Sequence, residues 1–326
     1  MAIDRFGRRI HYLRISLTDR CNLRCQYCMP EAVSFKPHDD LMQDDEIIRL
    51  ARIFASLGFD KIRLTGGEPT LRANVVDLTR RIAAIPGISS LTMTTNGSLF
   101  SSAAQALKEA GLQRVNFSLD TLDAHKYSQA TRGGLLDSVW QGIEAAEKAG
   151  LSPIKINVVV VRNFNELDVI DLARLSVDRP WHVRFIEMMP FAGATEFQVD
   201  HNVMMAEIER TIESSIGPLQ LLNNGRLDGE AQLFRIPNSQ GTIGFIASVS
   251  QPFCASCTRV RLTADGRLRL CLLNEMEVDL LNPMRTGYSD LQLKDLIIDA
   301  IWHKPWGHQL EDGVVANNRI MSEIGG

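Results

Sequence analysis

The sequence predicts an α/β protein whose first part is an open, partial (βα)6 barrel of the TIM type. From about residue 8 to residue 190, short strand-like runs alternate with amphipathic stretches of helical period, which is typical of repeated βα units and a parallel sheet. The strand-like runs also carry polar and basic residues at alternate positions. Beyond about residue 200 this alternation fades, and we place a domain boundary near residue 225.

The βα units contain six predicted strands, fewer than the eight of a closed barrel. Between them lie predicted helices, including 44–57 and 135–149, in which apolar residues recur on one face. After the barrel we expect a helix over 203–213, short strands over 232–237 and 241–250, and a helix over 291–302. The six strands are expected at 11–18, 61–67, 91–97, 114–120, 153–161 and 182–190.

Side chains alternate along a strand, so each predicted strand has an apolar face and a polar face. In the first strand Leu13 and Ile15 point one way, and Arg14 and Ser16 point the other. Because helices cover the outside of a barrel, the polar and basic residues are expected to line the lumen. A lumen of this kind indicates a bound ligand. A one-sided sheet with a solvated polar face is the alternative.

Composition narrows the classes of partner. The formal net charge of −4 gives no general basic field, which argues against nucleic acid or an anionic membrane as the main partner. We expect no secretory signal and no membrane span, because no apolar run is long enough. The sequence therefore predicts a cytoplasmic protein, in which cysteines serve metals more often than disulfides.

The first functional motif is a cysteine triad, Cys21, Cys25 and Cys28, with the spacing C-x3-C-x2-C. A structural zinc site needs four ligands, whereas an iron–sulfur cluster held by three thiolates keeps one iron open for another ligand. No fourth cysteine lies near, and His38 is the nearest histidine that follows the triad. We therefore predict a cluster, with zinc as the alternative.

The triad, with Tyr27 just before its last cysteine, resembles the motif of the radical S-adenosylmethionine (SAM) superfamily. The resemblance implies that SAM chelates the open iron and that Tyr27 lies beside the SAM adenine. It also implies that the Gly-Gly-Glu-Pro turn at 66–69 receives the SAM amino group. Gly67, Ser118 and Met189 would line the SAM pocket, although a simple tight turn and a rim methionine are the ordinary alternatives.

A second triad, Cys254, Cys257 and Cys271, takes up all the remaining cysteines and predicts a second cluster. Arg259 and Arg261 fall on one face of the strand that follows Cys257, where they could grip a phosphate or a purine edge. A solvated edge strand is the alternative. The isolated His303 and His308 are expected at the surface.

Taken together, the two triads, the turn at 66–69 and the terminal Gly-Gly make the whole chain resemble the GTP 3',8-cyclase family of molybdenum-cofactor biosynthesis. The resemblance implies a barrel over 1–225, its mouth covered by a smaller C-terminal domain over 226–326. Two 4Fe-4S clusters and SAM are the implied cofactors. Arg14, Arg63, Thr94, Lys155, Arg259, Val260 and Arg261 would bind GTP, with Lys61 and Arg184 as further candidates.

The implied reaction is that of a lyase. A 5'-deoxyadenosyl radical removes hydrogen from ribose C3' of GTP, and the substrate radical attacks guanine C8 to give 3',8-cyclo-7,8-dihydro-GTP. Gly325 and Gly326 would reach into the active site and assist turnover.

The implied partners are an electron donor protein and a cyclic pyranopterin monophosphate synthase that takes the product. The oligomeric state is left open, including a homodimer. Another radical SAM enzyme with an auxiliary cluster, such as a peptide maturase, is the alternative function.

Overall fold

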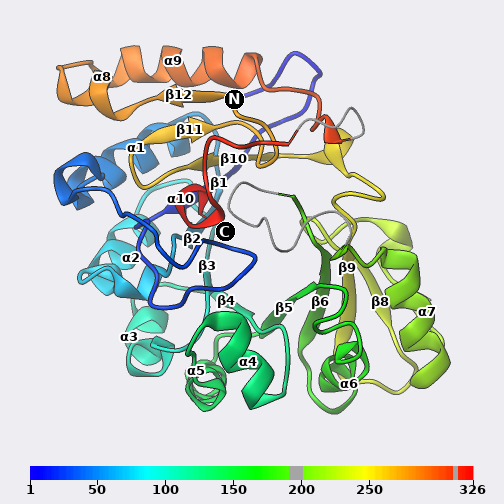
Figure 1. Ribbon diagram of the computed structural model, residues 1–326. Coiled ribbons are helices and arrows are strands. Elements are labelled where there is room, and N and C mark those ends of the chain that lie inside the picture. The colour runs from blue at the N-terminus through cyan, green and yellow to red at the C-terminus, as the bar shows by residue number, and fades with distance from the viewer. Residues whose placement is uncertain (191–200, 311–314, 326) are drawn as a thin grey trace.

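A computed structural model of the chain describes residues 1–190, 201–310 and 315–325, and its strands form one curved sheet (Figure 1). Six parallel strands form the middle of this sheet in chain order. The predicted α/β architecture with a partial barrel is confirmed. The six strands are β1 (Tyr12–Ser16), β2 (Lys61–Thr65), β3 (Ser90–Thr95), β4 (Arg114–Ser118), β5 (Lys155–Val160) and β6 (His182–Glu187).

Helices lie on the outer, convex side of the sheet (Figure 1). α1 (Asp44–Ser56) begins with a capping box between Gln43 and Glu46, and its apolar face is buried. The two predicted barrel helices and the helix expected over 203–213 are confirmed to within two residues at their ends. The others up to residue 215 are α2 (Val75–Ala83), α3 (Ala104–Glu109), α4 (Ala124–Thr131), α5 (Leu136–Lys148), α6 (Val169–Asp178) and α7 (Met205–Ser215).

Residues from the C-terminal part extend both edges of the barrel sheet. β10 (Arg259–Leu262) pairs in parallel with β1, and β9 (Thr242–Ile246) pairs in parallel with β6. The C-terminal part therefore completes the barrel wall as well as covering it. Beyond these strands lie β7 (Gln220–Leu221), β8 (Gln232–Arg235), β11 (Arg267–Arg269) and β12 (Glu277–Asp279), each antiparallel to its neighbour.

The last helices are α8 (Leu281–Arg285), α9 (Asp290–Trp302) and α10 (Met321–Ile324). α9 confirms the helix expected over 291–302, and a capping box between Ser289 and Gln292 fixes its start. Figure 1 shows α10 inside the curve of the sheet, at the barrel mouth. In the described part of the chain, no helix is long and apolar enough to cross a membrane.

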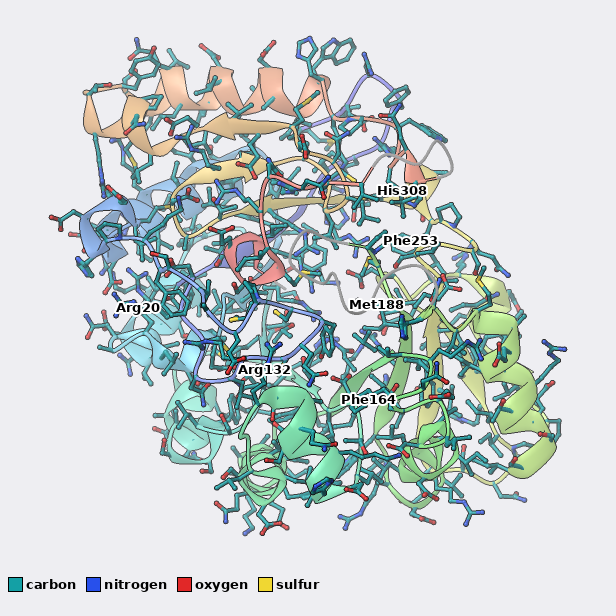
Figure 2. All side chains as sticks on the ribbon, viewed as in Figure 1. Arg20, Arg132, Phe164, Met188, Phe253 and His308 are labelled. Carbon is teal, nitrogen blue, oxygen red and sulfur yellow. The ribbon has the colours of Figure 1, made fainter. Side chains whose placement is uncertain are left out.

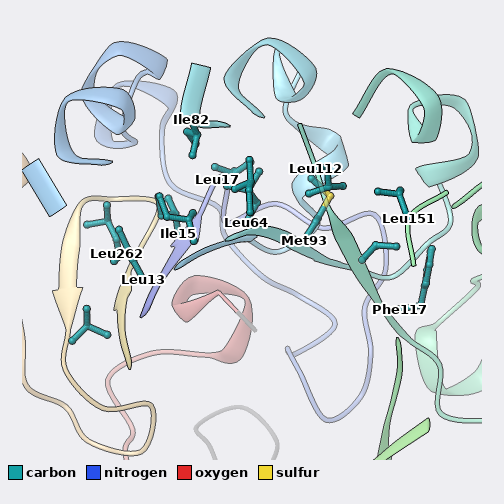
Figure 3. Close-up of a cluster of buried hydrophobic side chains, with 14 of the residues drawn as sticks. Leu13, Ile15, Leu17, Leu64, Ile82, Met93, Leu112, Phe117, Leu151 and Leu262 are labelled. Carbon is teal, nitrogen blue, oxygen red and sulfur yellow. The ribbon is translucent and has the colours of Figure 1, made fainter. Parts of the chain in front are cut away.

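The hydrophobic core lies between the outer face of the sheet and the helices. Leu13 and Ile15 are fully buried there beside Leu262 of the paired strand β10 (Figure 3). Phe100 and Phe117 meet edge to face at 5.4 Å. The predicted apolar faces of the strands are thus the faces that pack, which leaves the polar faces to the lumen.

Buried carboxylates stabilise the loops at the carboxyl ends of the strands. Glu68, 1% exposed, accepts hydrogen bonds from Thr70, Thr95 and the backbone N–H of Asn96, at 2.6 to 3.1 Å. Glu187 similarly accepts hydrogen bonds from residues that follow β6 and β9. These carboxylates hold the loops that surround the barrel mouth.

The division near residue 225 stays a prediction, and the sheet topology provides a test. A fragment of residues 1–225 lacks β9 and β10, and so loses Val260, Leu262, Ile243 and Phe245, all at most 3% exposed. Burial of such side chains contributes roughly 1.5–3 kcal/mol each, which together is comparable to the about 5–15 kcal/mol of a whole domain. We expect the fragment not to unfold cooperatively. A sharp thermal transition by circular dichroism would show instead that 1–225 folds alone.

Replacement of Glu68 by Gln tests the loop anchor. The amide of Gln presents donor hydrogens where backbone and hydroxyl donors now point, so we expect the free energy of unfolding to fall by about 1–3 kcal/mol. Urea unfolding of E68Q beside E31Q, a change at an exposed position, measures the difference. Equal stability of the two variants would contradict the anchoring role.

Candidate functional site

A cavity of about 300 Å3 lies at the carboxyl ends of the barrel strands, where the C-terminal residues fold over them. Its lining includes residues of both halves of the chain, from Arg14 of β1 to Ser322 of α10. Figure 2 shows Phe253 and His308 on one side of this region and Arg132 on the other. Loops that follow the strands and the C-terminal segment therefore enclose a single site.

All six cysteines are free and line this cavity. The first three lie on the loop after β1. In that loop the Cys28 backbone N–H donates to the Cys25 carbonyl at 2.9 Å, and Arg24 donates to the Cys21 carbonyl at 2.6 Å. Asn96, after β3, donates to the Cys21 sulfur at 3.7 Å. The loop is thus fixed to neighbouring strand ends.

Burial governs the chemistry of these thiols. Burial raises the pKa of the thiols of Cys21, Cys25 and Cys28, that of Cys28 to about 12. Thiolates bind metals, so loading the site must release protons. Tyr27 donates to Asp120 at 2.5 Å, and burial raises the pKa of this carboxyl to about 6.

The second triad lies across the cavity on two short connections. Cys254 begins a 3-10 turn, Cys257 directly follows that turn, and Cys271 follows β11. The fully buried Arg269 donates to the Cys271 carbonyl at 3.2 Å and pairs with Glu277 at 2.7 Å. This pairing holds the loop of the third cysteine in place.

The donor set fits the predicted iron–sulfur clusters in number and type, because each triad supplies three thiols and faces the cavity. Within the described ranges, no three His, Cys, Asp or Glu side chains are grouped so that they could hold a single metal ion.

Basic residues line the cavity and the lumen beneath it. Arg14, Arg63, Arg259 and Arg261 all line the main cavity. Burial, together with repulsion from the other arginines, lowers the pKa of Arg14 to about 10 and that of Arg259 to about 9. Buried positive charge of this kind makes the lumen a site for an anion.

Most of the predicted site residues meet in the main cavity, but Lys155 does not. Lys155 lines a second, smaller cavity of about 20 Å3 with Lys61 and Arg114. Arg63 and Arg184 line both cavities and so connect them. The predicted residues that line the main cavity, apart from the six cysteines and the four arginines above, are Tyr27, Gly67, Thr94, Ser118, Met189 and Val260.

The C-terminal tail contacts one of the predicted arginines. Arg261 donates to the carbonyl of Gly325 at 2.7 Å. Gly325 has a φ of +84°, and a side chain there would lie 2.6 Å from the hydroxyl of Thr65. Glycine is therefore required at this position. Gly326 lies outside the described residues.

The expectation for His308 is wrong. His303 is exposed as expected, but His308 lines the cavity, and its ring contacts the carbonyl of Ser248 at 2.9 Å. Its backbone N–H also donates to the Cys254 thiol. Chain folding, rather than any local motif, brings this segment over the second triad.

Sequence reasoning also missed Lys304 and Gly307. Lys304 is 2% exposed and contacts the carbonyl of Leu270, next to Cys271. A Cβ at Gly307 would lie 2.9 Å from the sulfur of Cys254. No sequence signal marks this segment, because its contacts with the second triad arise from packing between segments that are distant in the chain.

Comparisons with known proteins agree with the geometry. Residues 15–176 match the family model of the Radical SAM superfamily, and residues 181–310 match that of Molybdenum Cofactor Synthesis C. The structure is similar to that of Streptococcus suis SuiB bound to precursor peptide SuiA, with a TM-score of 0.63 and 15% identity. That match covers 91% of this chain and 66% of the other, and it shows the fold alone.

Two similar relatives are the GTP 3',8-cyclases of Pelotomaculum thermopropionicum and Moorella thermoacetica. Each is 47% identical over 324 residues, which cover 99% of this chain and 99% of the relative. Since these matches cover nearly the whole chain at 47% identity, the chain belongs to the GTP 3',8-cyclase family of the radical SAM superfamily.

Proposed function

We propose that this chain converts GTP to 3',8-cyclo-7,8-dihydro-GTP in molybdenum-cofactor biosynthesis. The observation that carries the proposal is that two cysteine triads and a set of buried arginines line one cavity. Family membership supports the same reaction. Peptide maturation, the alternative function, has only the likeness of fold to SuiB in its favour.

Each triad would hold one 4Fe-4S cluster, and the first would also bind SAM. Such a cluster with SAM supplies one-electron cleavage of the sulfonium, which provides the radical that removes hydrogen from ribose C3'. Tyr27, Gly67, Ser118 and Met189 would surround SAM. The Gly67 backbone is pressed against the loop before Cys21, because a Cβ there would lie 2.2 Å from the Arg20 carbonyl.

The remaining residues of the chain would bind and orient GTP. Arg14, Arg63 and Lys155 come from different strands and face the lumen, where their charges would offset the triphosphate. Thr94 accepts a hydrogen bond from Arg63 at 3.2 Å, which orients the guanidinium. Arg259, Val260 and Arg261 would contact GTP from the opposite side, beside the second triad.

The remaining roles stay predictions. Gly325 and Gly326 are proposed to assist turnover by holding Arg261 at the mouth of the pocket, since Gly325 already accepts its hydrogen bond. The same proposal includes two protein partners, namely an electron donor protein and the synthase that takes the product. It also includes a homodimer and a cytoplasmic location.

The proposed reaction is tested by iron content and product analysis. Anaerobically reconstituted protein should hold about eight iron atoms and form the cyclised nucleotide from GTP and SAM, as mass spectrometry would show. C25A should keep about four iron atoms and lose SAM cleavage. C257A should keep SAM cleavage and lose the cyclised product. Stoichiometric zinc with little iron would contradict the proposal.

The dependence of GTP binding on pH tests the assignment of Lys155. Burial and the nearby Arg184 lower the pKa of Lys155 to about 7, so the free protein loses this charge as pH rises through about 7. A triphosphate favours the charged form. The GTP affinity should therefore fall with pH, by up to about tenfold per unit above pH 7.

Affinity measured with and without the lysine isolates this effect from the ionisation of GTP itself. K155M should bind GTP more weakly below pH 7 and should lack the additional slope above it. Equal slopes for K155M and the unchanged protein, in calorimetric titrations without SAM, would mean that Lys155 does not contact the triphosphate.

A further inference from the structure

The turn between β7 and β8 directs two carboxylates into the basic lumen. Asp228 and Ala231 close this turn through a backbone hydrogen bond of 2.8 Å, and Gly229 at its tip has a φ of +69°. Asp228 and Glu230 both line the smaller cavity, and Glu230 also lines the main one. The turn therefore lies where the two cavities meet.

Asp228 pairs with two lumen cations at once. Its Oδ2 lies 2.7 Å from the ammonium of Lys155 and also accepts a hydrogen bond from Arg184. The side chains of Lys155 and Arg184 are 7% and 3% exposed, whereas Asp228 is 35% exposed. The acid is thus the accessible member of the cluster, at the end of a short turn.

Glu230 makes the equivalent contact on the other wall. Its carboxylate pairs with Arg259, whose guanidinium also lies 5.0 Å from the ring centre of Phe253. Lys155, Arg184 and Arg259 come from β5, β6 and β10, so two acids on one turn connect three strands across the lumen.

These cations are among those proposed to bind the triphosphate. A phosphate oxygen and a carboxylate oxygen compete for the same N–H donors, with similar geometry and charge. A triphosphate therefore cannot engage Lys155, Arg184 and Arg259 through the donors used now while both acids keep their places. Either the acid or the phosphate must therefore give up each shared donor.

We propose that Asp228 and Glu230 are intramolecular counterions that occupy the phosphate positions of the lumen until a polyphosphate displaces them. They keep the cations directed inward when no substrate is bound, and they lower the affinity for any polyanion. Only the identity of the anion, the triphosphate of GTP, rests on the proposed function.

The test measures binding of inorganic tripolyphosphate to the cluster-loaded protein by calorimetry. D228N and E230Q each remove one competing charge with little change of shape, so each should bind tripolyphosphate roughly tenfold more tightly. D77N and E207Q remove acids paired with exposed or half-exposed arginines elsewhere, Arg80 and Arg162, and should leave the affinity unchanged. A purely structural role for the turn predicts weaker binding in D228N and E230Q.

A second measurement needs no variant. Hydrogen exchange of the peptide that spans 223–235 should become faster when tripolyphosphate is added to the unchanged protein, because the turn loses its ion pairs. Unchanged or weaker binding by folded D228N and E230Q, or unchanged exchange in 223–235, would overturn the inference. If D228N and E230Q bind tripolyphosphate more tightly but the unchanged protein forms no cyclised product from GTP, the proposed substrate is contradicted and the counterion role stands.

Discussion

Buried positive charge in the lumen is the constraint on which the rest of the structure depends. A closed TIM barrel fills its interior with branched apolar side chains, and that packing makes the interior a core. Here Arg14, Arg63, Lys155 and Arg184 occupy the same place. Charged side chains cannot be packed together without counterions, because burial without a partner is costly. The sheet therefore stays open around a cavity. Within this cavity, the counterions are either acidic side chains of the protein or a bound anionic ligand.

Both halves of the chain contribute to this charged cavity. The N-terminal half provides the curved wall with its apolar outer face. The C-terminal half provides the strands at both edges, the acids of the 228–231 turn and the second cysteine triad. Arg261 shows the coupling most directly, since it pairs in register with Arg14 of β1 and donates to Gly325 of the tail. A substitution in any one of these segments is therefore expected to alter the positions of side chains in the common cavity.

Local pattern predicts the strands and the main helices, because each depends on side-chain period within a short segment. The spacing of the cysteines likewise groups them into two triads, and all six line one cavity, while their role as cluster ligands stays a prediction. Pairing between distant segments has no such signal. Nothing around Ile243 or Val260 indicates that these residues complete the two edges of the barrel sheet. Likewise, Asp228 and His308 contact partners far away in the sequence, so local pattern carries no signal that would place His308 in the cavity rather than at the surface.

The pairing of β1 with β10 also bears on how the chain is made. β1 is synthesised before the other strands of the sheet, yet β10, its partner on one side, follows more than two hundred residues later. Until then the edge of β1 exposes unpaired backbone groups and the cysteines of the neighbouring loop have no second wall. Contacts of such long sequence separation form slowly. Until the C-terminal half is synthesised, one edge of the barrel sheet is therefore open to pairing with other chains, and we expect the first cysteine triad to be more accessible than in the folded protein.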